Sequence, residues 1–432
     1  MFTLLGGVCM AKRWKRIVNL VVVFVFASSF LAISPNPVAA GAYIQVNTTI
    51  DYPTVNNSFC TLRWAIIAAN TNARYGGCPA GVPGAVNFIF LPASVNMYIL
   101  SIPGASEDNS LAGDLDILSS MEISGAGASV SKIYSSNTDR VFHIYNTSNI
   151  TLRNLEISAG ESSSGAGGGI FIQNSKNVTM QSIVVTKNHA ASAGGGIALD
   201  RNSSAIIDAS SISYNTSQQG GGILNEGTLT LKNSIVNNNT GSVANGGIDN
   251  NAQGTGYMEM VNTTVAENLS PIAAGVGSYT NITILNSTIV ANLGTGLYTG
   301  TNAPGWVKNS IIALQSNSGI NCAINSPAFA SAGHNIENGN ACGFTGPGDQ
   351  TGVAYLGLLV PYSYNGGPTE TYALSIDSPA VDAGDDNGCP ATDQRLYGRP
   401  ADGNEDGVGH CDIGSFELGG TYYTVTLPLI LH

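Results

Sequence analysis

The chain has 432 residues, of which 53 are Gly and 17 are Pro, and only 10% are charged. Because 43% are hydrophobic, the composition excludes a disordered polar chain, and the scarcity of charges excludes a coiled coil. The formal charge of −12 comes without basic clusters outside the first 40 residues, so nucleic acid and anionic membrane surfaces are disfavoured as partners.

The first 40 residues have the three parts of a secretory signal peptide. A basic cluster at residues 12–16 precedes an apolar run at residues 17–33, and the small residues of PNPVAA at residues 35–40 follow. We predict cleavage after Ala40 and export, which leaves 12 basic and 28 acidic residues. The apolar run is just long enough to cross a bilayer, so an uncleaved anchor is the alternative.

Six of the seven cysteines follow the signal peptide, and they form three pairs that are close in sequence. The pairs are Cys60 with Cys78, Cys322 with Cys342, and Cys389 with Cys411. Nearest-neighbour pairing keeps each loop local, and an exported compartment favours disulfides over a metal site. All six lie outside the repetitive middle of the chain, so we predict disulfides that staple its two ends.

The segment 60–70, CTLRWAIIAAN, predicts a short helix near the front of the chain. Its apolar positions 62, 65, 66 and 69 fall on one face, so the helix can lie as a lid across the first coil of a repeat structure. Ser58 or Thr61 can cap its start, and Asn70 can end it. We therefore assign residues 41–84 to an N-terminal cap.

From about residue 140 a pattern recurs: a Gly pair with an Ile, a polar stretch, alternating apolar residues and a closing Asn. Gly-Gly-Ile occurs at residues 168–170, 195–197, 221–223 and 246–248. The closing asparagines are Asn188, Asn215, Asn239, Asn268 and Asn292, which are 24 to 29 residues apart. A repeat of that length without helical periodicity predicts one coil of a parallel β-helix.

Each coil would hold two or three short strands, stacked ~4.8 Å above those of the previous coil. Leu229 and Leu231 alternate with Thr230 and Lys232, as in a strand with one buried face. We expect the Gly pairs to supply turn conformations with positive φ. We also expect the column of asparagines to hydrogen-bond from coil to coil, as stacked amides do.

Parts of the sequence also resemble three known protein families. CTLRWAI at residues 60–66, followed by Ala69-Asn70, resembles the CSLREA motif that opens many exported bacterial β-helix proteins, with Trp64 in place of an acidic residue. The Gly-Gly-Ile coils resemble polymorphic outer membrane protein repeats. Four segments resemble the choice-of-anchor Q domain: GGPTETYAL at residues 366–374, SPAVDAG at 378–384, TDQR at 392–395 and CDIGSFE at 411–417.

These resemblances imply an all-β, right-handed, single-stranded parallel β-helix of the pectin-lyase type, with a short N-terminal capping helix and disulfide-stapled ends. They also imply a secreted or cell-surface protein, with outer-membrane association as one form of attachment. The expected division is a signal peptide at 1–40, an N-terminal cap at 41–84, coils at 85–335, an anchor-Q-like C-terminal cap at 336–418 and an apolar tail at 419–432.

Catalysis on polysaccharides requires two carboxylates beside a glycosidic bond, or a cation with an Arg or Lys in a lyase. The coils offer Asp200, Asp208, Glu226, Asp249, Glu259 and Glu267, with Lys187, Arg201 and Lys232. They do not recur in one column, so we interpret them as solvent-facing charges. The histidines, at 143, 189, 334, 410 and 432, form no metal-binding or catalytic motif. We interpret His143 as a packed or surface side chain.

One acidic segment has the spacing that opens a calcium loop. Asp402, Asn404 and Asp406 are two residues apart and are followed by Gly407, in the pattern D-x-N-x-D-G. Ile413 occupies the twelfth position, which excludes an EF-hand, but Asp412 can complete a compact structural calcium site. The alternative is an Asp/Gly turn held by a Cys389–Cys411 bridge. No other cofactor is expected.

We therefore predict an exported, monomeric, non-catalytic rod for adhesion or glycan binding, whose partner is an extracellular polysaccharide or a surface glycan or protein. Membrane contact would come only through an uncleaved signal or C-terminal sorting. A polysaccharide lyase or glycoside hydrolase is the first alternative, and a structural surface-layer component is the second. A cleft lined by three or more carboxylates of adjacent coils would favour the enzyme.

Overall fold

The computed structural model describes residues 40–422 except 106, 137–138, 252–255 and 317. The predicted signal peptide and most of the predicted apolar tail therefore lie outside the described residues. The described residues from Gly41 onward form one compact unit. Among the described residues, no helix has both the length and the apolar character needed to cross a membrane.

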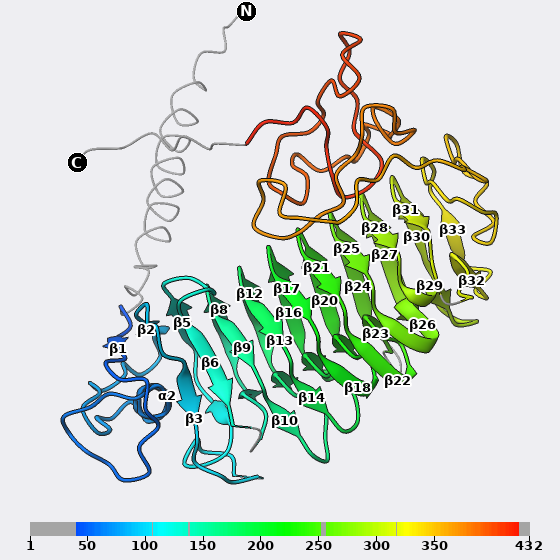
Figure 1. The fold of residues 1–432 in the computed structure, drawn as a ribbon. Helices are drawn as coiled ribbons and strands as arrows, with labels where there is room; N and C mark the ends of the chain where they lie inside the picture. Colours follow the sequence, from blue (N-terminus) through cyan, green and yellow to red (C-terminus); the bar gives the residue numbers. More distant parts are fainter. Residues whose placement is uncertain (1–39, 106, 137–138, 252–255, 317, 423–432) are drawn as a thin grey trace, which may run out of the picture. The chain divides into compact units, whose positions relative to one another are not determined.

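The described chain winds into a right-handed parallel β-helix, which confirms the predicted fold class (Figure 1). Successive turns contribute strands to three parallel sheets. Sheet 1 consists of β1 (Tyr43–Gln45), β2 (Asn87–Leu91), β5 (Met121–Gly125), β8 (Ser148–Arg153), β12 (Lys176–Gln181), β16 (Ser204–Asp208), β20 (Thr228–Lys232), β24 (Tyr257–Val261), β27 (Asn281–Leu285), β30 (Gly305–Lys308) and β33 (Phe329–Ser331).

Sheets 2 and 3 complete each turn. Sheet 2 consists of β3 (Tyr98–Leu100), β6 (Lys132–Ser135), β9 (Glu156–Ser158), β13 (Val184–Thr186), β17 (Ser211–Ser213), β21 (Ile235–Asn237), β25 (Thr264–Ala266), β28 (Thr288–Val290) and β31 (Ile311–Ala313). Sheet 3 consists of β4 (Leu115–Ile117), β7 (Phe142–Tyr145), β11 (Ile170–Gln173), β15 (Ile197–Leu199), β19 (Ile223–Asn225), β23 (Ile248–Asn250) and β26 (Leu269–Ser278), together with β10 (Glu161–Ser162), β14 (His189–Ala190), β18 (Thr216–Gln219), β22 (Thr240–Ala244), β29 (Leu293–Thr299) and β32 (Cys322–Ile324).

The interior of the β-helix is filled by the inward residues of each strand. In β20, Leu229 and Leu231 are fully buried while Thr230 and Lys232 point outward, as the alternation predicts. The register places Leu229 between Ala205 of the turn before and Met258 of the turn after. Apolar side chains thus stack on apolar side chains along the axis, and one continuous core results.

A ladder of buried asparagines runs beside this core, as the repeat predicts. Each Asn donates from its side-chain nitrogen to the side-chain oxygen of the Asn one turn later. The ladder comprises Asn188 to Asn215 (2.9 Å), Asn215 to Asn239 (3.0 Å), Asn239 to Asn268 (3.0 Å) and Asn268 to Asn292 (3.0 Å). The same nitrogens donate to strand carbonyls of the turn before, so the ladder joins three turns at every step.

The expected role of the Gly pairs is wrong. Positive φ occurs at the residue before each of the four pairs, at Gly167, Gly194, Gly220 and Asn245, and not within the pairs. The pairs are required for another reason, which is close packing against the ladder. A Cβ on Gly222 would lie 2.6 Å from the carbonyl oxygen of Gly247 and 2.9 Å from the side-chain nitrogen of Asn239. Only a residue without a side chain fits there.

The front of the β-helix is covered by helix α2 (Leu62–Thr71), which packs on β2 and β4. Thr61 caps its start by accepting from the backbone N–H of Trp64, and the left-handed Asn72 ends it, two residues after the expected Asn70. Buried Arg63 pairs with Asp51 at 2.9 Å, and the Cys60–Cys78 disulfide closes the segment.

At the far end, the Cys322–Cys342 disulfide and Phe344 join the interior core. Residues 353–420 then fold back along the outer face of sheet 2, a path that we did not predict (Figure 1). Val290 and Ile311 of that face pack with Phe416 and other apolar residues in a second core. The segment expected to cap the last coil thus covers a flank, and we call residues 353–420 the flank cover.

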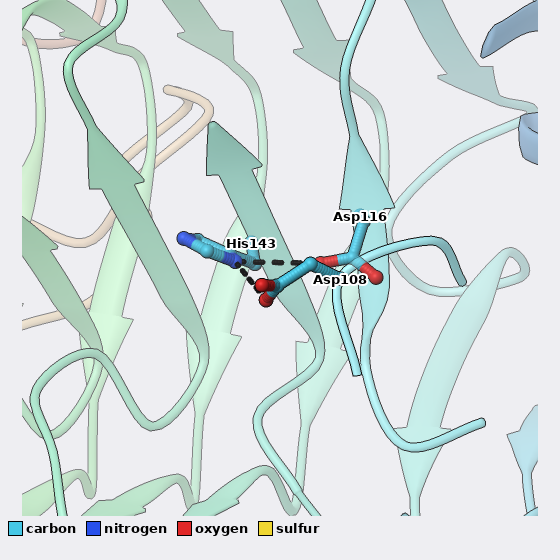
Figure 2. A group of neighbouring side chains, drawn as sticks. All are labelled: Asp108, Asp116 and His143. Carbon is cyan, nitrogen blue, oxygen red and sulfur yellow. Dashed lines mark ion pairs between the residues drawn. The ribbon is translucent and has the colours of Figure 1, made fainter. Parts of the chain in front are cut away.

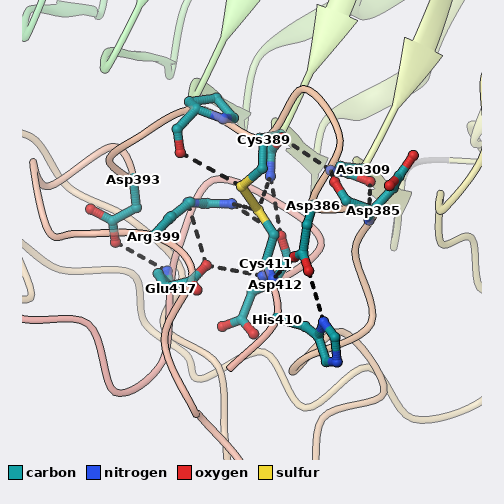
Figure 3. The surroundings of a disulfide bond; sticks show 12 residues. Asn309, Asp385, Asp386, Cys389, Asp393, Arg399, His410, Cys411, Asp412 and Glu417 are labelled. Atoms are coloured by element: carbon teal, nitrogen blue, oxygen red, sulfur yellow. Dashed lines mark hydrogen bonds and ion pairs between the residues drawn. A yellow bond between two sulfur atoms is a disulfide. The ribbon is translucent and has the colours of Figure 1, made fainter. Parts of the chain in front are cut away.

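A buried ionic network around the third disulfide, Cys389–Cys411, holds the flank cover together (Figure 3). Glu417 pairs with Arg399 at 3.4 Å and accepts from the backbone N–H of Asp412 at 2.9 Å. Asn309, which follows β30, exchanges two hydrogen bonds with the backbone of Asp385. The residues that resemble the anchor-Q motifs thus act in packing the flank cover.

The ladder makes a strong prediction for stability. Asn239 takes part in four buried hydrogen bonds with side-chain and backbone groups of the neighbouring turns. Replacing it, as Asn239→Ala, leaves buried donors and acceptors without partners, and each costs about 1–3 kcal/mol. We expect the free energy of unfolding in urea to fall by about 3 kcal/mol or more.

The matched control is Asn202→Ala, because Asn202 lies exposed in the turn between β15 and β16. Its free energy of unfolding should stay within about 0.5 kcal/mol of the parent. Equal losses in the two variants would show that the ladder is not a special source of stability.

Candidate functional site

A cleft of about 350 Å³ lies between one edge of the flank cover and the outer surface of the β-helix. One wall is the corner between sheets 1 and 2 in four successive turns, and the other is residues 364–370 of the flank cover. Its polar lining consists of Ser129, Lys132, Glu156, Ser182, Ser211, Tyr364, Thr369 and Glu370. The cleft therefore joins segments that are more than 150 positions apart in the chain.

The second wall is held firmly against the β-helix. Thr369 donates through its hydroxyl to the carbonyl of Asn233, at 3.2 Å. The side-chain nitrogen of Gln394 donates to the hydroxyl of Thr369 and to the carbonyl of Glu370. Thr264 of sheet 2 in turn donates to the side-chain oxygen of Gln394, at 2.7 Å. The shape of the cleft is thus set by buried hydrogen bonds.

The cleft carries few charges and many hydroxyl groups. Lys132 and Glu156 form an ion pair at 3.2 Å across two turns of sheet 2. Burial, with a smaller contribution from Glu267, raises the pKa of Glu370 above its ordinary value. Tyr364 is 60% exposed and presents an aromatic ring beside these polar groups. This combination can donate and accept hydrogen bonds and can stack on an apolar face of a ligand.

A second group of polar side chains lies on the outer face of sheet 3, near its first turn. Asp116 of β4 and His143 of β7 are paired in the register, and Asp108 lies in the loop before β4 (Figure 2). The Nδ1 atom of His143 is 3.3 Å from an Asp116 oxygen and 4.0 Å from an Asp108 oxygen. The three ligand atoms lie within 4.8 Å of one another.

The neighbours of this group are charged and aromatic. Arg140 pairs with Asp114 at 3.1 Å and lies over the ring of Phe171. Burial, together with the nearby carboxylates of Asp116 and Asp139, raises the pKa of Asp114 to about 7. Burial lowers the pKa of His143, but its contacts with Asp116 and then Gln173 outweigh burial, so that its pKa is raised.

The carboxylates that the sequence analysis considered lie apart from each other. Asp200 caps its own turn, Asp208 pairs with Lys232 at 3.5 Å, and Glu267 accepts from the hydroxyl of Tyr362. Asp249 was expected to face solvent, and that expectation is wrong because the side chain is fully buried. Asp200, Asp208 and Glu267 thus have structural partners, whereas neither carboxylate oxygen of Asp249 has a hydrogen bond. None of these carboxylates lines the cleft of about 350 Å³.

The predicted calcium residues occupy two different environments. Asp402, Asn404 and Asp406 accept hydrogen bonds from backbone N–H groups of their own exposed loop. Asp412 is fully buried and accepts from the backbone of Asp382 and Leu418. These contacts match the Asp/Gly turn that was the alternative, and calcium binding stays a prediction.

Sequence reasoning missed both the cleft and the Asp108–Asp116–His143 group. Asp116 precedes His143 by 27 residues, which is one repeat, so their pairing was visible in the period. A signal for the flank cover also existed, since the strands of sheet 2 change from polar Ser211-Ile212-Ser213 to apolar Ile311-Ile312-Ala313. A strand without polar positions is buried on both faces.

Residues 119–269 match the family described as a right-handed beta helix region. No curated protein sequence matches the chain. Among solved structures, similar folds occur in pectate lyase Pel9A (TM-score 0.45, 12% identity, covering 88% of this chain and 98% of that one) and in the A-module of mannuronan C-5 epimerase AlgE6 of Azotobacter vinelandii (0.41, 14%, 69% and 94%). The catalytic domain of a GH87 alpha-1,3-glucanase in complex with nigerose is a more distant match (0.29, 13%, 70% and 70%). This likeness concerns the fold and carries no argument about function.

Burial of Asp249 predicts a pH dependence of stability. Burial raises the pKa of Asp249 to about 7 from its ordinary 3.8, so the folded chain keeps a proton that the unfolded chain releases. The free energy of unfolding should therefore fall between about pH 5 and 7, by about 1 kcal/mol per pH unit from this group. Asp249→Asn removes this loss and should be more stable than the parent at pH 8.

Urea unfolding of both chains at pH 5 and at pH 8 measures the effect, because other titrating groups cancel in the difference. Asp377→Asn is the control, since Asp377 is exposed in the flank cover. A stability difference between Asp249→Asn and the parent that is the same at both pH values would contradict the buried, protonated carboxyl.

Proposed function

We propose that this chain is an exported β-helix rod that binds an extracellular glycan, without cleaving it, in the cleft beside residues 364–370. One observation carries the proposal: a firmly walled cleft of about 350 Å³ that combines hydroxyl groups, one ion pair and an exposed tyrosine. A cleft of that volume lies at the lower end of small-ligand sites, which suits one or two sugar units.

The chemistry of the lining fits a neutral or weakly charged sugar. Ser182 and Ser211 can both donate and accept hydrogen bonds, as sugar hydroxyl groups require. Tyr364 offers a ring for the apolar face of a sugar and a hydroxyl for its edge. Lys132 and Glu156 satisfy each other at 3.2 Å, so binding need not leave an isolated charge in the cleft.

Export, surface location and monomeric state belong to the same proposal. The signal-like segment at residues 1–40 and the three disulfides support an oxidising, extracellular compartment. The partner would be a polysaccharide or a glycan of another surface protein, and the acidic chain makes nucleic acid a poor partner. A surface-layer role would instead appear as regular end-to-end assembly of the purified chain.

A glycoside hydrolase is the second candidate, and one observation favours it. Glu156 and Glu370 line the same cleft, and burial raises the pKa of Glu370, as in a general acid. Glu156, beside Lys132, would be the ionised partner. The pairing of Glu156 with Lys132 also serves a purely binding role, so the test must separate binding from cleavage.

The experiment uses residues 41–432 with a panel of neutral and acidic polysaccharides, with and without calcium. Bound protein is pulled down, while reducing ends and the ultraviolet absorbance of unsaturated uronates are followed in the same tubes. We expect binding without either product. Tyr364→Ala should weaken that binding about tenfold, which corresponds to about 1.4 kcal/mol of lost contact.

Tyr355→Ala is the matched control, because Tyr355 is as exposed as Tyr364 (61%) and does not line the cleft. Equal effects of the two variants would remove the cleft from the proposal. Cleavage that Glu370→Gln abolishes, with binding retained, would replace the binding role with hydrolysis. Absence of binding and cleavage across the panel would overturn the proposal.

A further inference from the structure

We propose that Asp108, Asp116 and His143 form a binding site for a divalent transition-metal ion of the Zn²⁺ type. The group lies on sheet 3, and none of its residues lines the glycan cleft or belongs to the predicted calcium loop. The proposal therefore does not depend on the proposed function. It depends on geometry, on one buried oxygen without a donor, and on the local charge.

The distances between the ligand atoms suit a small cation. In tetrahedral coordination, bonds of about 2.0–2.2 Å to zinc place neighbouring ligand atoms about 3.3–3.6 Å apart. His143 Nδ1 is 3.3 Å from the Asp116 oxygen, which is within that range. The Asp108 oxygen is 4.0 Å away on a side chain that is 66% exposed, so a rotation of this side chain can close the site.

Asp116 supplies an independent indication of a missing ligand. Its side chain is fully buried, and its Oδ2 atom accepts from the backbone N–H of Ser110 at 2.7 Å. Its Oδ1 atom has no hydrogen bond and faces the ring of His143 (Figure 2). A buried carboxylate oxygen without a donor is costly, and a bound cation would remove that cost.

The ring of His143 is oriented as a ligand would be. Its Nε2 atom lies 3.0 Å from the side-chain oxygen of Gln173, which can only accept, so Nε2 carries the proton. In the neutral ring Nδ1 then presents its lone pair to the two aspartates, as in metal sites whose second nitrogen is held by an outer partner. The rings of Tyr145 and Phe171 stack on His143 and fix its plane.

The loop that carries Asp108 is anchored by the N-terminal cap. Arg63 donates to the carbonyls of Ser110, Gly113 and Asp114 and so places the chain just before Asp116. Arg63 and the loop that carries Asp108 are far apart in the sequence, and these hydrogen bonds hold them together. The site is thus built from the N-terminal cap and two turns of the β-helix.

Local charge also favours a cation. Four aspartates lie in this region, namely Asp108, Asp114, Asp116 and Asp139. Among the described residues, Arg140 is the one arginine that forms an ion pair with a carboxylate of this group, that of Asp114. One imidazole with two carboxylates favours zinc or manganese over calcium, which prefers oxygen ligands alone. The competing interpretation is a metal-free pair of protonated His143 with Asp116.

Titration calorimetry separates the two interpretations. Residues 41–432 without a polyhistidine tag, with intact disulfides and freed of metal by a chelator, are titrated with ZnCl₂, MnCl₂ and CaCl₂. We expect one Zn²⁺ per chain, with weaker Mn²⁺ binding and little Ca²⁺ binding at this site. Asp108→Asn and His143→Gln should each weaken Zn²⁺ binding about tenfold or more.

The controls use groups of similar composition elsewhere in the chain. His189→Gln changes a histidine that lies 3.8 Å from Glu161, and Asp406→Asn changes the predicted calcium loop. Neither should alter Zn²⁺ affinity. Because Asp108 is exposed, Asp108→Asn is expected to fold, and its thermal midpoint without metal should match the parent. No Zn²⁺ binding by the parent, or binding that survives both site variants, would overturn the proposal.

Discussion

The buried asparagine ladder is the interaction on which the rest of the structure depends. Its amides hydrogen-bond from turn to turn and at the same time satisfy strand carbonyls, as Asn239 does with Ile212 and Asn268. A polar column inside a solenoid is tolerable only when every group has a partner. From Asn188 to Asn292 the ladder therefore fixes which residue of each turn lies above which, and the outer faces of these turns inherit that register.

The parallel register between neighbouring turns, which also holds in the turns before the ladder, explains why the outside of the β-helix can carry specific sites. Because Asp116 and His143 are paired in neighbouring strands, their side chains point the same way and meet. At the other corner, Lys132 and Glu156 are paired in the same manner. Each turn thus adds one side chain to a row that runs along the outside of the β-helix. A site forms where polar side chains of such a row lie beside a loop or beside the flank cover.

The flank cover decides where the outer surface is open. It buries the apolar outer faces of the later strands of sheet 2, such as Ile311, and leaves outward residues of earlier strands, such as Glu156 of β9 and Val184 of β13, half-buried. Its edge, held by Thr369 and Gln394, forms one wall of the cleft. Burying charged pairs such as Arg399 with Glu417 costs desolvation, which the surrounding hydrogen bonds offset.

The sequence by itself determined the coil, the inward faces and the disulfide partners. These features are periodic or local, so that the spacing of Asn215 and Asn239, or of Cys389 and Cys411, carries them directly. Only the tertiary structure decided that Tyr364 and Glu370 line the same cleft as Lys132. The docking of the flank cover on the β-helix depends on the complementary shapes of two distant segments, and the spacing of residues in the sequence does not contain that information. The Gly pairs show the same limit: the sequence contains them visibly, but the close approach of Gly222 to Asn239 and Gly247 exists only when two successive turns are stacked.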